Sequence, residues 1–249
     1  MMVEKAARPL TLGGEMKYKE GNTMLEKMFR MFLPDSARMA IDNMKILFLH
    51  HGQYETFKRK ISTDRAGEPV PWFTYPAIEF LAQLDLGEKT VFEYGGGAST
   101  LYFSKRCRKL YSVDDDLAWH EMAKKTSFGG GRCKYAADKQ EYVSFIHEVD
   151  GSIDLIVIDG KYRYECAAEA VKKLAPDGMI ILDNSDWHEK TAKYLRNNDL
   201  IEIDMAGFGP VNAFAWTTSF FMTRKIELKT ISGRQPAYAV GGFHYDEEV

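Results

Sequence analysis

Short apolar runs alternate with amphipathic stretches over the second half of the chain. The apolar runs predict strands, since four to seven residues rich in Val, Ile, Tyr and Phe are typical of buried strands. Strands are predicted over residues 90–94, 109–114, 133–137, 153–159, 179–184, 200–205 and 217–224. Apolar residues at helical spacing predict helices over 99–107, 117–125, 141–149, 164–174 and 188–197, the fourth closed by a turn at 175–178. Such alternation predicts a parallel sheet with helices on both faces.

The connection between the last two predicted strands differs from the others. "AGFGPVNAFAW", residues 206–216, has no helical period. Parallel neighbours need a long crossover, usually a helix, whereas antiparallel neighbours need only a loop. The pattern therefore predicts an α/β fold whose seven-stranded sheet is mostly parallel, with one antiparallel strand near an edge.

The N-terminal third has a different organisation. A polar, mobile tail is expected up to about residue 22, followed by two amphipathic helices over 25–32 and 37–48. We expect these two helices to cover the carboxyl ends of the strands. A linker over 62–72 precedes another helix at 74–84. The predicted organisation is a tail and helical cap (1–68), a Rossmann-like domain (69–227) and a C-terminal tail (228–249).

Charge and cysteine content exclude several classes of protein. The net charge of −3 gives no basic excess for nucleic acid. No segment has the length and apolarity of a membrane span, and the first ten residues lack the apolar core of a signal peptide. Cys107, Cys133 and Cys166 are isolated, which favours buried thiols in a reducing compartment. We expect a cytoplasmic protein without a nucleic-acid or membrane partner.

Three glycines, Gly95 to Gly97, follow the first predicted strand and lead into a helix. Glycine permits positive φ and lets a ligand approach the backbone closely. Asp114 ends the next strand, 19 residues after Gly95, at the distance where an acidic side chain binds ribose hydroxyls. The pattern predicts a site for a nucleoside that carries an anionic group. A dinucleotide fingerprint would place Thr100 where Gly or Ala is required, which disfavours NAD.

The glycine turn also carries a family resemblance. Glu93-Tyr94-Gly95-Gly96-Gly97 resembles the first motif of class I S-adenosylmethionine-dependent methyltransferases, and "YSVDDD" is similar to their second motif. With the reversed last strand, the resemblance covers roughly residues 70 to 225. It implies a Rossmann-like fold that binds S-adenosylmethionine. The cofactor-binding residues that it implies are Tyr75, Glu93, Tyr94, Gly95, Gly97, Asp114, Asp115, Asp138 and Asp159.

A second cluster follows the fourth and fifth strands. Asp159 and the pair Asp183-Asn184 end these strands, in a pattern that resembles metal-dependent, catechol-type O-methyltransferases. The resemblance implies that these three side chains hold Mg²⁺, which prefers oxygen ligands. "IDGKYRYE" is similar to a motif that has His where this chain has Tyr162. Without a metal, the candidates that orient or deprotonate the acceptor are Asp159, Lys161, Tyr162, Asp186 and His188.

Together these features predict a methyltransferase, most simply one that methylates a hydroxyl of a small molecule or a glycan. Aromatic residues in "PWFTY" and "GFGPVNAFAW" are expected to line the acceptor pocket. The alternatives are an NAD(P)-dependent oxidoreductase and a binding module that has the fold without the activity. A homodimer is a further expectation.

Overall fold

The computed structural model describes residues 28, 30–232 and 236–242. Its centre is a seven-stranded sheet in the order β3-β2-β1-β4-β5-β7-β6. The strands are β1 (Thr90–Tyr94), β2 (Lys109–Asp114), β3 (Arg132–Tyr135), β4 (Ile153–Ile158), β5 (Leu174–Asp183), β6 (Ile201–Gly207) and β7 (Trp216–Met222). β7 runs antiparallel to both β5 and β6, while the other neighbours pair in parallel. The predicted α/β fold is confirmed: the sheet is mostly parallel, and its reversed strand β7 lies next to the edge strand β6.

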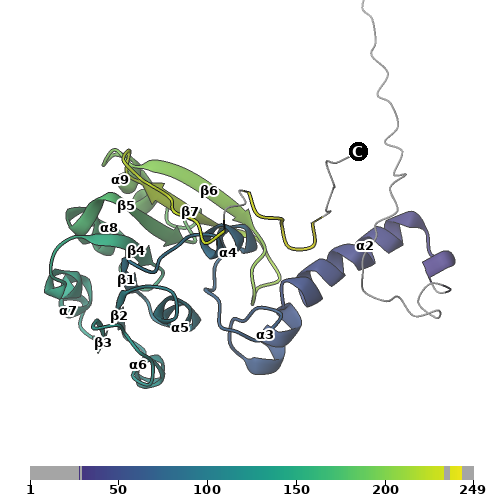
Figure 1. The fold of residues 1–249 in the computed structure, drawn as a ribbon, viewed down its shortest axis with the longest axis horizontal. Helices are drawn as coiled ribbons and strands as arrows, with labels where there is room; N and C mark the ends of the chain where they lie inside the picture. The colour runs from purple at the N-terminus through teal and green to yellow at the C-terminus, as the bar shows by residue number, and fades with distance from the viewer. Residues whose placement is uncertain (1–27, 29, 233–235, 243–249) are drawn as a thin grey trace, which may run out of the picture.

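Helices pack on both faces of the sheet (Figure 1). They are α4 (Tyr75–Ala82), α5 (Ala98–Ser104), α6 (Leu117–Ala123), α7 (Lys139–Ser144), the 3₁₀ turn η2 (Phe145–Glu148), α8 (Arg163–Lys173) and α9 (Glu189–Arg196). Successive residues of a strand point to opposite faces, so Val91 joins the core beside α4 and α5, while Phe92 joins the core beside α7, α8 and α9. Both faces are therefore apolar, as the unbroken hydrophobic runs predict.

One predicted turn has a different structure. Residues 175–178 were expected to form the turn that closes α8, but they belong to the beginning of β5. Leu174 pairs with Ile153, and the register then shifts, so that Met179 pairs with Leu155. Leu174, the first residue after α8, already pairs with the start of β4. The residues between Leu174 and Met179 therefore form a bulge in the pairing of β4 with β5.

The N-terminal helices are α2 (Asp35–Lys45), the π-helical turn η1 (Ile46–His50) and α3 (Gln53–Arg59). Figure 1 shows α2 projecting away from the sheet, and none of its residues is buried. In contrast, α3 is anchored to the body of the protein, since the Gln53 side chain donates to the carbonyl of Gly209 at 2.9 Å. The expected mobile tail, half of the expected first helix and the last seven residues lie outside the described residues.

The C-terminal segment returns to α4. The backbone N–H of Val240 donates to the Glu79 carboxylate at 3.0 Å, and Thr230 forms an isolated bridge with Leu84. The division at residues 68 and 227 stays a prediction, as does the homodimer. Among the described residues, no helix is both long and apolar enough to cross a membrane.

A buried carboxylate connects β1, β2 and the glycine turn. Glu93 is fully buried, and its Oε2 accepts from the hydroxyls of Thr100 at 2.5 Å and Ser112 at 3.0 Å. Thr100 Oγ1 in turn accepts from the N–H of Gly97 at 3.0 Å. Burial raises the pKa of Glu93 to about 7, because the charged form loses its hydration. These hydrogen bonds therefore hold the glycine turn in place from inside the protein.

This pKa predicts a stability that falls as pH rises. The unfolded chain loses the Glu93 proton near the usual pKa of 4.5, whereas the folded chain keeps it up to about pH 7. The contribution of protonated Glu93 to the free energy of unfolding is thus fully present below pH 4.5. It amounts to about 3 kcal/mol at most and is lost as the pH rises from 4.5 to about 7. Since Glu93→Gln has no charge to lose, its stability relative to the native chain should rise by about that amount between pH 4.5 and about pH 8. Urea unfolding of both proteins at both pH values measures the difference, and an unchanged difference would contradict the assignment.

Candidate functional site

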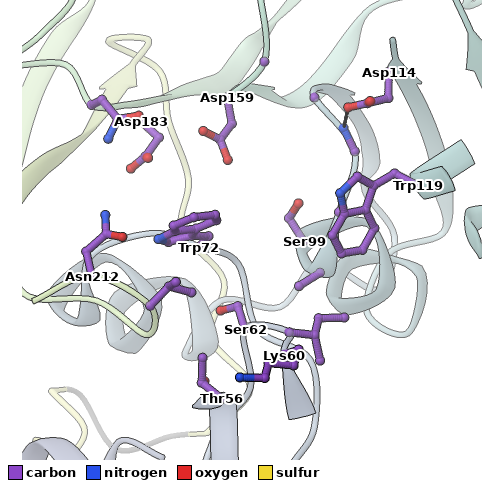
Figure 2. A pocket seen from close by; sticks show the side chains of 18 of the residues that line it. Thr56, Lys60, Ser62, Trp72, Ser99, Asp114, Trp119, Asp159, Asp183 and Asn212 are labelled. Carbon is purple, nitrogen blue, oxygen red and sulfur yellow. Dashed lines mark hydrogen bonds between the residues drawn. The ribbon is translucent and has the colours of Figure 1, made fainter. Parts of the chain in front are cut away.

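A cavity of about 580 Å³ lies at the carboxyl ends of the central strands. This edge is where open α/β sheets bind their ligands. Figure 2 shows Asp114, Asp159 and Asp183 on one side of the cavity and residues of α3 and the following linker on the other. The residues that line it are Thr56, Phe57, Lys60, Ile61, Ser62, Trp72, Gly95, Gly96, Gly97, Ala98, Ser99, Asp114, Trp119, Asp159, Gly160, Arg163, Asp183, Asn184, Trp187, Val211 and Asn212.

The glycine turn forms one wall of the cavity. Gly95 has φ +97°, and a Cβ there would lie 2.5 Å from the backbone nitrogen of Gly160, so only glycine fits. Gly97 differs, because a Cβ at this position would have no atom within 4 Å. The bare backbone of Gly97 thus faces open space in the cavity.

Asp114 lies beside this turn, where β2 ends. One carboxylate oxygen accepts from the N–H of Gly96 at 2.6 Å and the other from the N–H of Asp116 at 2.5 Å. These bonds orient the carboxylate, and each oxygen keeps a second lone pair for a ligand. Burial raises its pKa. Trp119, at the beginning of α6, lines the cavity close to Asp114 (Figure 2).

Two carboxylates point into the cavity from neighbouring strands. Asp159 follows β4 and Asp183 ends β5 (Figure 2). Asp183 Oδ1 accepts from the indole N–H of Trp216 at 3.0 Å and from the hydroxyl of Thr218 at 2.5 Å. Burial raises the pKa of both carboxyls, and for Asp159 the nearby Asp183 charge raises it further. Both carboxyls therefore keep a proton to higher pH than an exposed aspartate does.

Arg163 lies between these two strand ends and was not among the predicted residues. It is the first residue of α8 and is directed there by Tyr162, whose φ of 54° turns the chain sharply before the helix. Its guanidinium donates to Asp159 Oδ1 at 3.2 Å and to Asn184 Oδ1 at 3.0 Å. No clear signal in the sequence pointed to it, because the i,i+4 pairing rule applies within a helix and Asp159 lies before α8 begins.

The three side chains predicted to hold Mg²⁺ do come together, but with protein partners. Asp159 and Asn184 each direct an oxygen at Arg163, and Asp183 Oδ1 is taken by Trp216 and Thr218. Within the described part of the chain, no group of three His, Cys, Asp or Glu side chains is arranged to hold a metal. A permanently charged guanidinium among the intended ligands repels a divalent cation, so the arrangement does not fit the ion.

Several other predicted residues lie away from the cavity lining. Tyr75 is buried and stacks on His51, and Tyr94 donates its hydroxyl to the carbonyl of Val143. Alternation along β1 explains Tyr94 and the buried Glu93, since their side chains point to the two faces of the sheet rather than to its carboxyl edge.

The remaining predicted residues have structural partners. Lys161 forms an ion pair with Asp115, and Asp138 caps α7 by accepting from the N–H of Glu141 at 3.0 Å. The Tyr162 ring packs edge-on against Tyr142. His188 is half-buried at the beginning of α9.

The wall opposite the strands was expected from residues 25–48; for α2 and η1, the described helices of this range, the expectation was wrong. The lining residues of the N-terminal segment belong to α3 and to positions 60–62, whereas α2 does not line the cavity. α3 is short and follows a glycine with positive φ, so its helical period is too brief to be recognised. Trp72 of "PWFTY" lines the cavity as expected, while "GFGPVNAFAW" contributes Val211 and Asn212 rather than its aromatic residues.

No protein-family model and no curated protein sequence matches the chain. Solved structures with a similar fold include the O-methyltransferase TomG from Streptomyces achromogenes in complex with S-adenosylmethionine, at 11% identity and a TM-score of 0.49 over 72% of this chain and 89% of that one. The N-methyltransferase NodS from Bradyrhizobium japonicum is similar at 18% identity and a TM-score of 0.42, over 58% and 92%. A precorrin 8w decarboxylase from Methanobacterium thermoautotrophicum is similar at 17% and 0.44, over 62% and 92%. These likenesses concern the fold; the strand order with its reversed β7 is that of class I methyltransferases.

Proposed function

We propose that the chain is an S-adenosylmethionine-dependent methyltransferase that acts on a hydroxyl of a small molecule or glycan. One observation carries the proposal. The cavity joins the open backbone of Gly97 and the carboxylate of Asp114 to the carboxylate of Asp159. A nucleoside site and a proton acceptor thus share one enclosed space, as a group transfer between two bound molecules requires.

The nucleoside half of the cavity suits S-adenosylmethionine. The Asp114 oxygens accept from ribose hydroxyls, the Trp119 ring offers a face to the adenine, and the backbone at Gly97 leaves room for the amino-acid part. The cavity volume is within the range of small-molecule sites. When bound, S-adenosylmethionine supplies an electrophilic methyl group on a positively charged sulfur.

We assign Trp72, Trp187 and Ile61, which line the same cavity as Asp159, to the acceptor half. The indole rings of Trp72 and Trp187 cover apolar parts of the acceptor and exclude water. Asp159 accepts the proton of the acceptor hydroxyl as the oxygen attacks, and its raised pKa suits this role. Both aromatic rings and the C–H faces of sugars pack on indole rings, so the two tryptophans favour an acceptor with an apolar face.

The rivals differ in what they bind. For an NAD(P) enzyme, Thr100 stands where the fingerprint needs Gly or Ala, and its hydroxyl is engaged with Glu93. Calorimetry with S-adenosylhomocysteine and with NAD⁺ distinguishes the two, and binding of NAD⁺ alone would overturn the proposal. A binding module without activity would bind S-adenosylhomocysteine but form no product from S-adenosylmethionine with any acceptor.

Gly97→Ala should block the cofactor without harming the fold. The added methyl group meets no protein atom within 4 Å and projects into the space assigned to the cofactor. We expect at least a tenfold loss of S-adenosylhomocysteine affinity, about 1.4 kcal/mol, with little change in thermal midpoint. Gly87→Ala is the matched control, because Gly87 lies in the turn before β1 and outside the cavity lining. Equal affinity of both variants would remove Gly97 from the site.

Asp159→Asn should separate chemistry from binding. The amide oxygen still accepts from Arg163, but it cannot take up a proton at neutral pH. Turnover should fall about 100-fold or more, while S-adenosylhomocysteine affinity stays within about twofold. The assay measures S-adenosylhomocysteine formed with a panel of phenols and sugars, and Asp199→Asn, at an exposed ion pair, is the control. Full turnover in Asp159→Asn would exclude this carboxylate as the proton acceptor.

A further inference from the structure

Arg163 is surrounded by oxygen atoms from two adjacent loops. A guanidinium has five N–H donors, and in this structure all five have an acceptor. The acceptors are Gly160 O at 3.0 Å, Asp159 O at 2.9 Å, Asp159 Oδ1 at 3.2 Å, Asn184 Oδ1 at 3.0 Å and the carbonyl oxygen of Asp183. Every acceptor lies in the segment after β4 or at positions 183 and 184, where β5 ends, so the guanidinium joins the two strand ends where the acceptor site lies.

This oxygen cage has the composition of a hard-cation site. It offers a carboxylate, an amide oxygen and three backbone carbonyls, the types of group that hold Mg²⁺ or Ca²⁺ in proteins. The Arg163 side chain is only 11% exposed, and a buried arginine needs partners of this kind. One positive charge also balances part of the negative charge of Asp159 and Asp183. The guanidinium therefore supplies what a bound metal would otherwise supply.

We propose that Arg163 is the resident cation of the acceptor site, occupying the oxygen cage in place of a divalent metal and directing Asp159 toward the acceptor. The role in directing Asp159 rests on the proposed function, whereas the occupation of the oxygen cage does not. Arg163 is a positioning residue: it holds Asp159 through Oδ1 and leaves Oδ2 for the acceptor. Arginine suits the task because it stays charged at all physiological pH values and its planar fork reaches several oxygens at once.

The proposal predicts that removing the charge at residue 163 creates a metal site. Mn²⁺ is the probe, because electron paramagnetic resonance distinguishes bound from free ion. Arg163→Gln and Arg163→Ala should bind one Mn²⁺ at least tenfold more tightly than the native chain, through Asp159 and Asp183. The double variant Arg163→Gln/Asp159→Asn should lose the gained affinity. Arg224→Ala is the matched control, because Arg224 is exposed and pairs only at the surface with Asp199.

Arg163→Lys tests whether the positive charge of residue 163, rather than the volume of its side chain, excludes the metal. Lysine keeps the positive charge and should exclude Mn²⁺ as the native chain does, whereas glutamine should admit it. In Arg163→Ala, millimolar guanidinium ion should displace Mn²⁺ and raise the thermal midpoint, and the native chain should show neither effect. Equal Mn²⁺ binding by the lysine and glutamine variants would overturn the proposal, as would stoichiometric Mn²⁺ binding by the native chain that depends on Asp159.

These outcomes do not depend on the proposed function. If S-adenosylhomocysteine fails to bind the native chain, the methyltransferase assignment fails, but the Mn²⁺ results still decide the role of Arg163. If Arg163→Gln and Arg163→Ala do not fold, measurements on the native chain decide the role of Arg163. A thermal midpoint unchanged by millimolar Mg²⁺ supports a resident guanidinium, and a midpoint that Mg²⁺ raises only while Asp159 is intact overturns it.

Discussion

The close approach of Gly95 and Gly160 is the constraint on which the rest of the site depends. The two glycines follow the neighbouring parallel strands β1 and β4, and a Cβ at Gly160 would lie 2.8 Å from Gly95 Cα and 2.0 Å from the Tyr142 hydroxyl oxygen. Any side chain at either position would push the two loops apart. Because both are glycine, the glycine turn and the loop that carries Asp159 form one continuous wall of the cavity.

Acidic groups lie on both sides of this wall, and the protein stabilises them by different means. Behind it, Glu93 is buried among hydroxyl groups without a positive charge, which raises its pKa and favours the neutral form. In front of it, Asp159 faces the cavity and has the Arg163 guanidinium as a partner. Burial raises the pKa of both carboxyls, but only Asp159 has a cation beside it that opposes the shift, and only Asp159 faces the cavity.

The opposite side of the cavity depends on contacts between segments that are distant in the sequence. α3 is held by the bond from Gln53 to Gly209, in the connection between β6 and β7. That connection also brings Asn212 to the cavity, and β7 brings Trp216 to Asp183. The reversed last strand thus does more than complete the sheet, because its approach shapes the pocket and orients one of the two carboxylates.

The sequence by itself determined the strands, most helices, the sheet with its reversed strand, and the residues at the strand ends, among them Gly97, Asp114, Asp159 and Asp183. These follow from hydrophobic period and turn residues, which are local properties. Only the tertiary structure decided that Glu93 lies behind the turn, that Arg163 donates to two of the three side chains predicted to hold a metal, and that α3 rather than α2 lines the cavity. Each of these depends on where a side chain points when separate segments pack together, and local pattern does not contain that information.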